Sequence, residues 1–296
     1  MINEININGW NNKVVNHPTV IYPQCNDEGA PKNYFVALFV GARGSGKTYL
    51  LTKLLKTFEE KKCYKYGEVV PQRIVLISPT AYSDSNVIFK SLKNLDWDED
   101  VLTEYSDEIL KEKIQELKKD WDDAKEYQEY EQCYKKFKKL KIDKLTDEEC
   151  KLLYKYNFEK IEDIPEPKYP NGFLLHFIID DMIGSNIFKN GKSAFTNLVT
   201  KNRHVTPGNI IIATQAIMQI PKTIRLNSNL IVLFKFANKK QVIDDIYPVV
   251  SAYVTEDQLM ELYNHATAEP HDTLVIDGTA SKIVFEKQLI FSIIIY

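Results

Sequence analysis

Residues 35–48 read FVALFVGARGSGKT, an apolar run of strand length that leads into a glycine-rich loop. The last eight residues match the pattern G-x-x-x-x-G-K-[ST], and leucines at helical spacing follow over 47–60. Glycines let the backbone curl so that consecutive N–H groups face inward, and the following helix points its positive end at the same place. We therefore expect a nucleotide-phosphate site at Gly41, Ala42, Arg43, Gly44, Ser45, Gly46, Lys47 and Thr48.

Three side chains of this loop have separate expected roles. Lys47 adds a point charge for the β- and γ-phosphates of ATP, and the Thr48 hydroxyl is an oxygen ligand that suits Mg²⁺. Arg43 is expected to face solvent, with a phosphate contact as the alternative. The loop therefore predicts ATP and Mg²⁺ as cofactors.

Acidic and amide side chains at the ends of two later apolar runs complete the expected site. Residues 173–179, FLLHFII, read as a buried strand that ends at Asp180 and Asp181. We expect Asp180 to bind Mg²⁺ through water and Asp181 to orient the attacking water, the alternative being a polar loop start. Gln215, at the end of the run 210–215, is expected to sense the γ-phosphate and the lytic water, or else to cap its strand.

The order of strands and helices predicts the fold. Apolar runs of strand length alternate with helical patterns at 35–40, 73–78, 173–179, 210–215 and 230–234. Such alternation favours a mainly parallel sheet covered by helices on both faces. One strand between the loop strand and the Asp-bearing strand, with another after it, is typical of the additional-strand branch. The sequence therefore predicts a three-layer α/β P-loop NTPase of the RecA-like branch.

The chain divides into an irregular N-terminal arm, 1–34, and one ATPase domain, 35–296, which ends in a hairpin signal at Asp277-Gly278. A charged helical insertion interrupts the domain at about 100–168, with a long amphipathic helix or two over 104–141 and a further helix at 146–157. The insertion is either a solvated helical element or a partner-docking or lid element.

Composition limits the class of protein. With 296 residues, 44% hydrophobic and 27% charged, the chain is not collagen, a disordered tail or a small disulfide scaffold. Its four cysteines form no Cys-x-x-Cys pair, and the start carries no signal-peptide pattern. The apolar run at 289–296 is too short to span a bilayer. We expect reduced thiols and a soluble, intracellular protein.

The charge balance limits nucleic-acid binding to a local patch or a ring interior, because the net charge is only −3. Only four of the 38 basic residues are arginine, so lysine is the usual basic residue of this chain. Each arginine therefore indicates a role that only a guanidinium group can fill, the alternative being an ordinary surface charge.

A further stretch, residues 201–215, reads KNRHVTPGNIIIATQ and resembles the FtsK/HerA superfamily of DNA-pumping ATPases. Within it, the chain is most similar to the poxvirus-type genome-packaging ATPases of large nucleocytoplasmic DNA viruses and virophages. Shared features are Ser78-Pro79-Thr80, Asp180-Asp181, Arg203-His204 and residues 220–229, IPKTIRLNSN. The similarity covers about 35–290 without the insertion.

The resemblance implies a ring-shaped homo-oligomer, a pentamer or hexamer, that hydrolyses ATP to push double-stranded DNA into a preformed capsid. Arg203 resembles the arginine finger that acts in trans on a neighbouring subunit, and guanidinium suits the charge of that transition state. Arg225 is structural or a second interface residue. FtsK and HerA carry Glu where this chain has Asp181, whose side chain is one methylene shorter.

DNA contact would be independent of sequence, through lysines that meet phosphates. Lys189 and Lys192, in the loop 184–192, are the candidates, the alternative being an ordinary solvated loop. A capsid or vertex protein is the other implied partner, with no membrane span, and the implied location is the virion and the host-cell cytoplasm. The rival interpretations are a cellular or plasmid DNA pump of the same superfamily and an ATP-dependent capsid-assembly switch with little DNA movement.

Overall fold

The computed structural model describes residues 24–25, 30–65, 68–140, 144–182, 184–188, 193–202, 208–236, 238–279 and 284–287. Most of the expected N-terminal arm lies outside these residues. Among the described residues, no helix combines the length and apolar composition that a membrane crossing requires.

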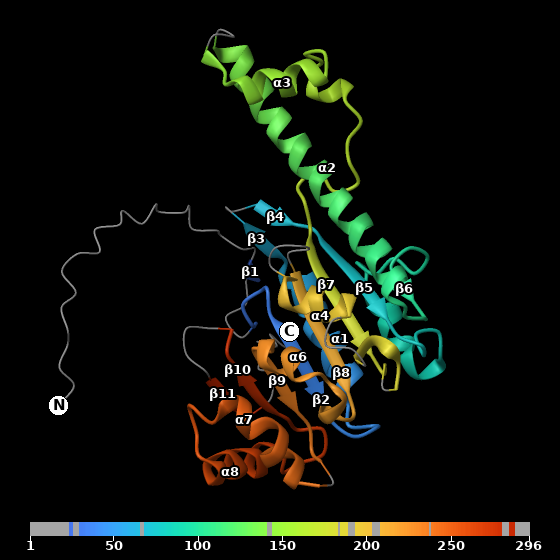
Figure 1. The fold of residues 1–296 in the computed structure, drawn as a ribbon, viewed down its shortest axis with the longest axis vertical. Coiled ribbons are helices and arrows are strands. Elements are labelled where there is room, and N and C mark those ends of the chain that lie inside the picture. Colours follow the sequence, from blue (N-terminus) through green and yellow to red (C-terminus); the bar gives the residue numbers. More distant parts are fainter. Residues whose placement is uncertain are drawn as a thin grey trace, which may run out of the picture.

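An eight-stranded sheet forms the centre of the fold (Figure 1). Its strands, in spatial order, are β11 (Val284–Lys287), β10 (Leu274–Asp277), β9 (Leu230–Leu233), β2 (Val36–Val40), β8 (Gly208–Thr214), β7 (Leu174–Asp180), β5 (Gln72–Ile77) and β6 (Val101–Leu102). In this order, adjacent strands from β9 through β6 are parallel to each other. Strand β10 is antiparallel to both β9 and β11. Because β8 lies between β2 and β7, the order is that of an additional-strand ATPase. The expected α/β fold with a mainly parallel sheet is confirmed.

Helices cover both faces of this sheet. The helical elements are α1 (Lys47–Lys61), η1 (Asp84–Ser91), α2 (Asp107–Lys139), α3 (Asp147–Lys155), η3 (Ile161–Asp163), η4 (Asn186–Phe188), α4 (Ala194–Thr200), η5 (Ile217–Gln219), α6 (Lys222–Asn227), the π-helix η6 (Val242–Ile246), α7 (Tyr247–Val250) and α8 (Glu256–Ala266). Three short strands, β1 (Gln24–Cys25), β3 (Cys63–Lys65) and β4 (Glu68–Val70), form a separate antiparallel sheet.

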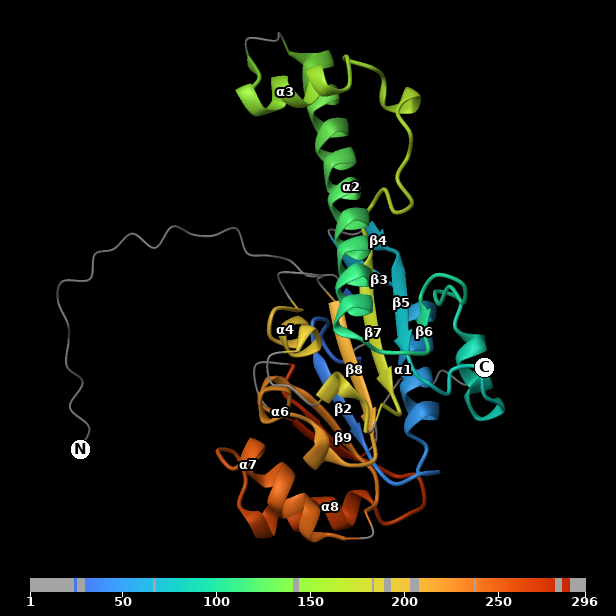
Figure 2. The same ribbon diagram turned by 45° about the vertical axis from the view of Figure 1, so that its right-hand side comes forward.

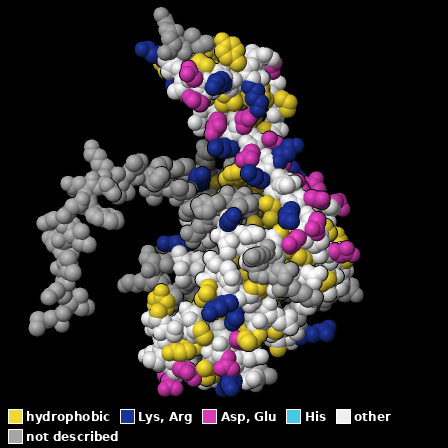
Figure 3. Space-filling model, in the orientation of Figure 1, with side chains coloured by type: hydrophobic (Ala, Val, Ile, Leu, Met, Phe, Trp, Pro, Cys, Tyr) yellow, Lys and Arg dark blue, Asp and Glu magenta, His cyan; other side chains and the backbone are white. Residues whose placement is uncertain are grey.

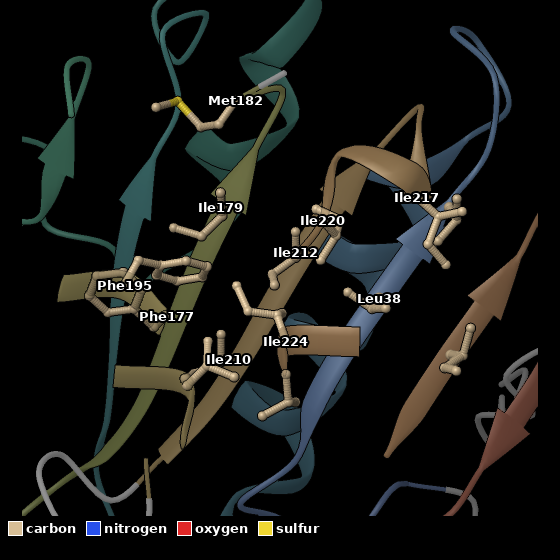
Figure 4. Packing of buried hydrophobic residues seen from close by; sticks show 14 of the residues in the cluster. Leu38, Phe177, Ile179, Met182, Phe195, Ile210, Ile212, Ile217, Ile220 and Ile224 are labelled. Carbon is tan, nitrogen blue, oxygen red and sulfur yellow. The ribbon is translucent and has the colours of Figure 1, made fainter. Parts of the chain in front are cut away.

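Alternation along β2 produces two cores. Val36, Leu38 and Val40 pack on one face with α4, α6, α8 and the first half of α2. Figure 4 shows Leu38 in this core together with Phe195 of α4 and Ile224 of α6. Ala37 and Phe39 pack on the opposite face with α1 and η1. Side chains of a strand point alternately to its two faces, so one short strand contributes to both layers.

The expected long helix is a single helix, α2, of 33 residues. Its first half packs on the sheet and its second half projects beyond the edge where the parallel strands begin, carrying α3 at its far end (Figure 2). A small core around Tyr130 and Leu153 joins the two helices there. Acidic and basic side chains alternate over this projection (Figure 3), in agreement with its nearly balanced sequence charge.

Arg73, one of the four arginines, fastens α2 to the sheet. It is almost fully buried at the start of β5, and its guanidinium donates two hydrogen bonds of 2.8 Å to Asp100. It also donates to Glu116 at 2.6 Å and to Asp120 at 2.5 Å, both on α2. A planar guanidinium can serve three carboxylates at once, which an ammonium cannot do with the same geometry. The role of Arg73 is therefore structural.

His176, in the middle of β7, is fully buried, as expected for a core histidine. Its Nε2 lies 3.1 Å from Gln72 Oε1, and its Nδ1 accepts from Asn209 Nδ2 at 3.2 Å. Asn209 Oδ1 in turn accepts from the backbone N–H groups of Tyr34 and Phe35. Burial lowers the pKa of His176 to about 3, so the ring is neutral at physiological pH.

Candidate functional site

The loop 41–46 turns sharply from the end of β2 into α1, and its glycines permit this path. Gly44 has φ +75° and Gly46 has φ +100°, both in the left-handed region that favours glycine. At Gly41, an added Cβ would lie 2.6 Å from the Cβ of Phe234. The Gly41 N–H donates to the Thr214 carbonyl at 3.2 Å, which ties the loop to the end of β8. Backbone conformation and close packing therefore both require glycine here.

Lys47, the first residue of α1, folds back over the loop. Its Nζ donates to the carbonyl oxygens of Gly41 and Ala42, each at 2.9 Å. Burial lowers the pKa of Lys47, while the charges of Asp180 and Asp181 oppose that effect. The ammonium group thus lies between the loop backbone and the two carboxylates.

Asp180 and Asp181 lie where β7 ends. Asp180 is only 4% exposed, and burial, reinforced by Asp181 and opposed by Lys47, raises its pKa to about 6. Asp181 has φ +53°, so the chain turns directly after Asp180. Gln215 Nε2, just beyond β8, donates to Asp181 Oδ1 at 3.2 Å. Two residues 34 positions apart in sequence thereby hold each other in place.

One cavity of about 610 Å³ collects most of the predicted residues at the edge of the sheet where the parallel strands end. Its lining residues are Arg43, Gly44, Gly46, Lys47, Thr48, Tyr49, Thr80, Asp180, Asp181, Ala213, Thr214 and Gln215. Arg43 lines the cavity and is exposed, so the structure leaves both of its expected roles open. Ser45 has a buried hydroxyl with no hydrogen-bond partner among the described residues.

The oxygen ligands in this cavity fit Mg²⁺. Thr48 provides a hydroxyl and Asp180 a carboxylate, and no hydrogen bond reaches that carboxylate from the described residues. A buried carboxylate with a raised pKa is one whose charge an added cation would stabilise. In the described part of the chain, no group of three or more His, Cys, Asp or Glu side chains is arranged so that it could hold a metal ion by itself. Mg²⁺ commonly takes one or two protein ligands and completes its shell with water and phosphate oxygens.

Three predicted residues lie outside the described residues: Arg203, Lys189 and Lys192. Their roles stay predictions. Arg225 lies on α6, and its NH1 is 3.6 Å from Oδ1 of the buried Asp245, which supports the structural interpretation of this arginine.

Sequence reasoning missed His271. Its Nδ1 lies 3.0 Å from the Ser45 carbonyl oxygen, and since a carbonyl only accepts, Nδ1 carries the proton. Residues 226 positions apart are joined by this contact, and no motif surrounds His271 that could have indicated it. The sequence also gave no sign that Tyr49 would line the cavity; Thr80 was noted only as part of Ser78-Pro79-Thr80.

No protein-family model and no curated protein sequence matches the chain. Solved structures with a similar fold include the genome packaging NTPase B204 of Sulfolobus turreted icosahedral virus 2 in complex with AMP. It is 14% identical, with a TM-score of 0.49, and the match covers 86% of this chain and 98% of that one. The pCW3 conjugation coupling protein TcpA is 12% identical, with a TM-score of 0.42 and coverage of 87% and 60%. ATPases 2 and 3 of EssC from Geobacillus thermodenitrificans are 14% identical, with a TM-score of 0.44 and coverage of 88% and 39%. These likenesses concern the fold alone.

Proposed function

We propose that the chain is a Mg²⁺-dependent ATPase. The observation that carries this proposal is the meeting of the phosphate loop, Asp180, Asp181 and Gln215 in one cavity. Enzymes that hydrolyse a phosphoanhydride in this way combine three parts. They are a glycine-rich loop at the start of a helix, an acidic residue at a strand end and a polar group on the next strand.

Each part has a chemical task. The loop N–H groups and Lys47 bind the β- and γ-phosphates, and Lys47 exchanges its bonds to the Gly41 and Ala42 carbonyls for phosphate oxygens. Thr48 and Asp180 hold Mg²⁺, which, when bound, offsets the negative charge on the phosphates. Lys47 also offsets part of the negative charge near Asp180.

Asp181 accepts a hydrogen bond from the attacking water and orients it toward the γ-phosphate. The amide of Gln215 fixes one of its carboxylate oxygens, which leaves the other oxygen for the water. This pairing compensates for the shorter reach of Asp181 relative to the Glu of FtsK and HerA. Asp181 and Gln215 therefore act together.

The finer proposal is an ATP-driven translocase that packages double-stranded DNA into a preformed viral capsid. The support is the sequence resemblance in residues 201–215 and 220–229. Subunits form a homo-oligomeric ring of five or six, Arg203 completes the neighbour's site, and Lys189 and Lys192 contact DNA phosphates without sequence preference. A capsid or vertex protein is the docking partner, and the virion and host-cell cytoplasm are the places of action. A cellular or plasmid DNA pump of the same superfamily is the nearest alternative.

The projecting insertion favours a second candidate, an ATP-dependent capsid-assembly switch. Its far end has a core of its own and presents Tyr154 and Leu140, 65% and 46% exposed. Exposed apolar side chains on a projection are typical of protein contacts. A switch would hydrolyse ATP in response to a protein partner and not to DNA.

ATP turnover with and without long double-stranded DNA tests these proposals. We expect DNA to stimulate turnover, Lys47→Ala and Arg203→Ala each to abolish it, and a mixture of the two variants to recover part of it. The recovery follows because an Arg203→Ala subunit keeps Lys47 and can receive Arg203 from its neighbour. Lys125→Ala, on an exposed part of α2, is the matched control and should behave as wild type. If ATP turnover is the same with and without DNA, the proposal of DNA translocation is wrong. If the wild-type chain shows no ATP turnover, the proposal of an ATPase is wrong.

A further inference from the structure

Cys25 and Cys63 lie directly opposite each other in the small antiparallel sheet, Cys25 on β1 and Cys63 on β3 (Figure 1). Opposite residues of an antiparallel pair point to the same face, with Cα and Cβ atoms each about 4.5–5.5 Å apart. A disulfide needs Cα atoms about 4.4–6.8 Å apart and Cβ atoms about 3.5–4.5 Å apart. The register of β1 and β3 therefore holds the two thiols within a small adjustment of disulfide geometry.

The two side chains also contact each other. A hydrogen bond with the Cys25 side chain is the main cause that lowers the pKa of the Cys63 thiol, against the opposing effect of burial. Both cysteines are free thiols in this structure. The two sulfur atoms are thus neighbours before any reaction takes place.

A chain of amide groups directs a hydrogen-bond donor at the Cys63 sulfur. Asn209 Oδ1 accepts from the backbone N–H groups of Tyr34 and Phe35, so its Nδ2 points the other way and donates to Asn33 Oδ1 at 2.8 Å. Because the Asn33 oxygen is held there, Asn33 Nδ2 faces Cys63 Sγ at 3.5 Å. A donor aimed at sulfur favours the thiolate, which is the nucleophilic form of cysteine.

The two cysteines differ in their access to solvent. Cys63 is fully buried, whereas Cys25 is partly exposed on a strand of only two residues at the edge of its sheet. A dissolved oxidant therefore meets Cys25 first. Cys63 needs no solvent access of its own, because the sulfur with which it would react is the one that it already contacts.

We propose that Cys25 and Cys63 form a reversible disulfide by exchange with a low-molecular-weight disulfide such as oxidised glutathione. The Cys25 thiolate attacks one sulfur of the oxidant, whose S–S bond breaks and releases one glutathione thiolate. The Cys63 thiolate then attacks Cys25 Sγ, which releases the second glutathione thiolate. The protein loses two protons and two electrons, and oxidised glutathione gains them and becomes two thiols.

The new bond would close a covalent loop over residues 26–62, which contains β2, the phosphate loop and α1. Cross-linking the ends of a loop restricts the unfolded chain more than the folded one, so the oxidised form should be the more stable. The bond would also join β1 to the strand that directly follows α1. The redox state of this pair would therefore set the stability of the segment that carries the phosphate loop.

Peptide mapping of the wild-type chain tests the proposal directly. The chain is incubated with oxidised glutathione, its free thiols are alkylated, and it is digested with trypsin, which cuts at Lys32 and Lys62 between the two cysteines. We expect mass spectrometry to find the peptides of Cys25 and Cys63 joined and two hydrogens lighter than their sum. Dithiothreitol should separate them. A lasting mixed disulfide of glutathione at Cys25, a bond from Cys25 to another cysteine, or both cysteines alkylated would overturn the proposal.

Thermal unfolding tests the effect of the bond on stability. Oxidation should raise the melting temperature of the wild type by about 5 °C, and dithiothreitol should reverse the rise. Cys25→Ala should show no rise, whereas Cys150→Ala, which removes another partly exposed thiol, is the matched control and should rise as wild type does. An equal rise in Cys25→Ala and in wild type would contradict the pairing. The peptide map needs no variant, so it decides the pairing even where a variant does not fold.

Discussion

Two buried ionisable side chains on β7 give the stability of the ligand-free chain opposing responses to pH. Burial lowers the pKa of His176 from 6.5 to about 3. For Asp180, burial first and Asp181 next raise the pKa from 3.8 to about 6, against Lys47. We predict that His176→Gln and Asp180→Asn tilt the pH profile of unfolding in opposite directions.

The signs follow from which state binds more protons. Between pH 3 and 6.5 the unfolded chain protonates His176 and the folded chain does not, so the stability that His176 contributes is full above pH 6.5 and is lost as pH falls. Between pH 3.8 and 6 the folded chain keeps the proton on Asp180 and the unfolded chain does not. The contribution of Asp180 is therefore full below pH 3.8 and is lost as pH rises through 6.

The magnitudes follow from the shifts at about 1.36 kcal/mol per pKa unit. From pH 8 to pH 5, His176 costs the folded state about 2 kcal/mol, whereas Asp180 returns about 1 kcal/mol. In the wild type these two contributions partly cancel. Relative to His176→Gln, the wild type should lose about 2 kcal/mol over this interval, and relative to Asp180→Asn it should gain about 1 kcal/mol.

Urea unfolding at pH 8 and pH 5, with EDTA and without nucleotide, measures these differences. Groups that do not interact with the substituted side chain cancel in each comparison, so the other histidines do not enter. If the difference between wild type and His176→Gln stayed constant within about 0.5 kcal/mol across the interval, the assignment of His176 as a neutral core residue would be wrong.

Four further substitutions, of which Gly184→Ala is a control, test the backbone and the anchor of α2. Gly46→Ala places a side chain at φ +100° and should lower the stability by about 1–2 kcal/mol and abolish nucleotide binding. Gly184→Ala, at φ +83° in open space, should lower the stability by a similar amount and leave nucleotide binding unchanged. Thermal unfolding measures the stability of both variants, and calorimetric titration measures their nucleotide binding. Gly208→Ala would put its Cβ 2.3 Å from the Leu175 carbonyl oxygen and should force β7 and β8 apart, at a cost above about 2 kcal/mol by urea unfolding. Arg73→Met leaves the buried Asp100 with Lys113 as its remaining ion-pair partner and should cost about 3 kcal/mol, with faster hydrogen exchange of the amides in the first half of α2; exchange at the wild-type rate would show that α2 does not depend on this anchor.

Local rules account for most of what the sequence predicted. The loop that follows β2 can be recognised in the sequence because its glycines, its lysine and the strand and helix beside it are contiguous. Asp180, Asp181 and Gln215 were predictable from strand ends alone, because parallel strands end at the same edge of a sheet. Their common cavity follows from this rule.

Contacts between distant residues could not be predicted. His271 reaches the loop 41–46 only because β10 returns antiparallel beside β9, and nothing near His271 in the sequence indicates that return. The scarcity of arginine pointed to special roles, but for Arg73 that role is to hold α2, which depends on carboxylates 27 to 47 positions away. Composition can indicate that an arginine matters without indicating what it binds.

The cavity and the projecting insertion lie at opposite ends of the same strands, and a hydrogen bond ties the start of α2 to the start of α4. Asp107, the first residue of α2, accepts hydrogen bonds from the Ala194 N–H at 3.2 Å and from the Tyr105 hydroxyl. Ala194 begins α4, which follows the segment that leaves the cavity at Asp181. Arg73, on β5, holds the same helix at Glu116 and Asp120. The first half of α2, a helix about 50 Å long, is therefore fixed both at its start and one third of the way along, and only its second half extends freely from the sheet.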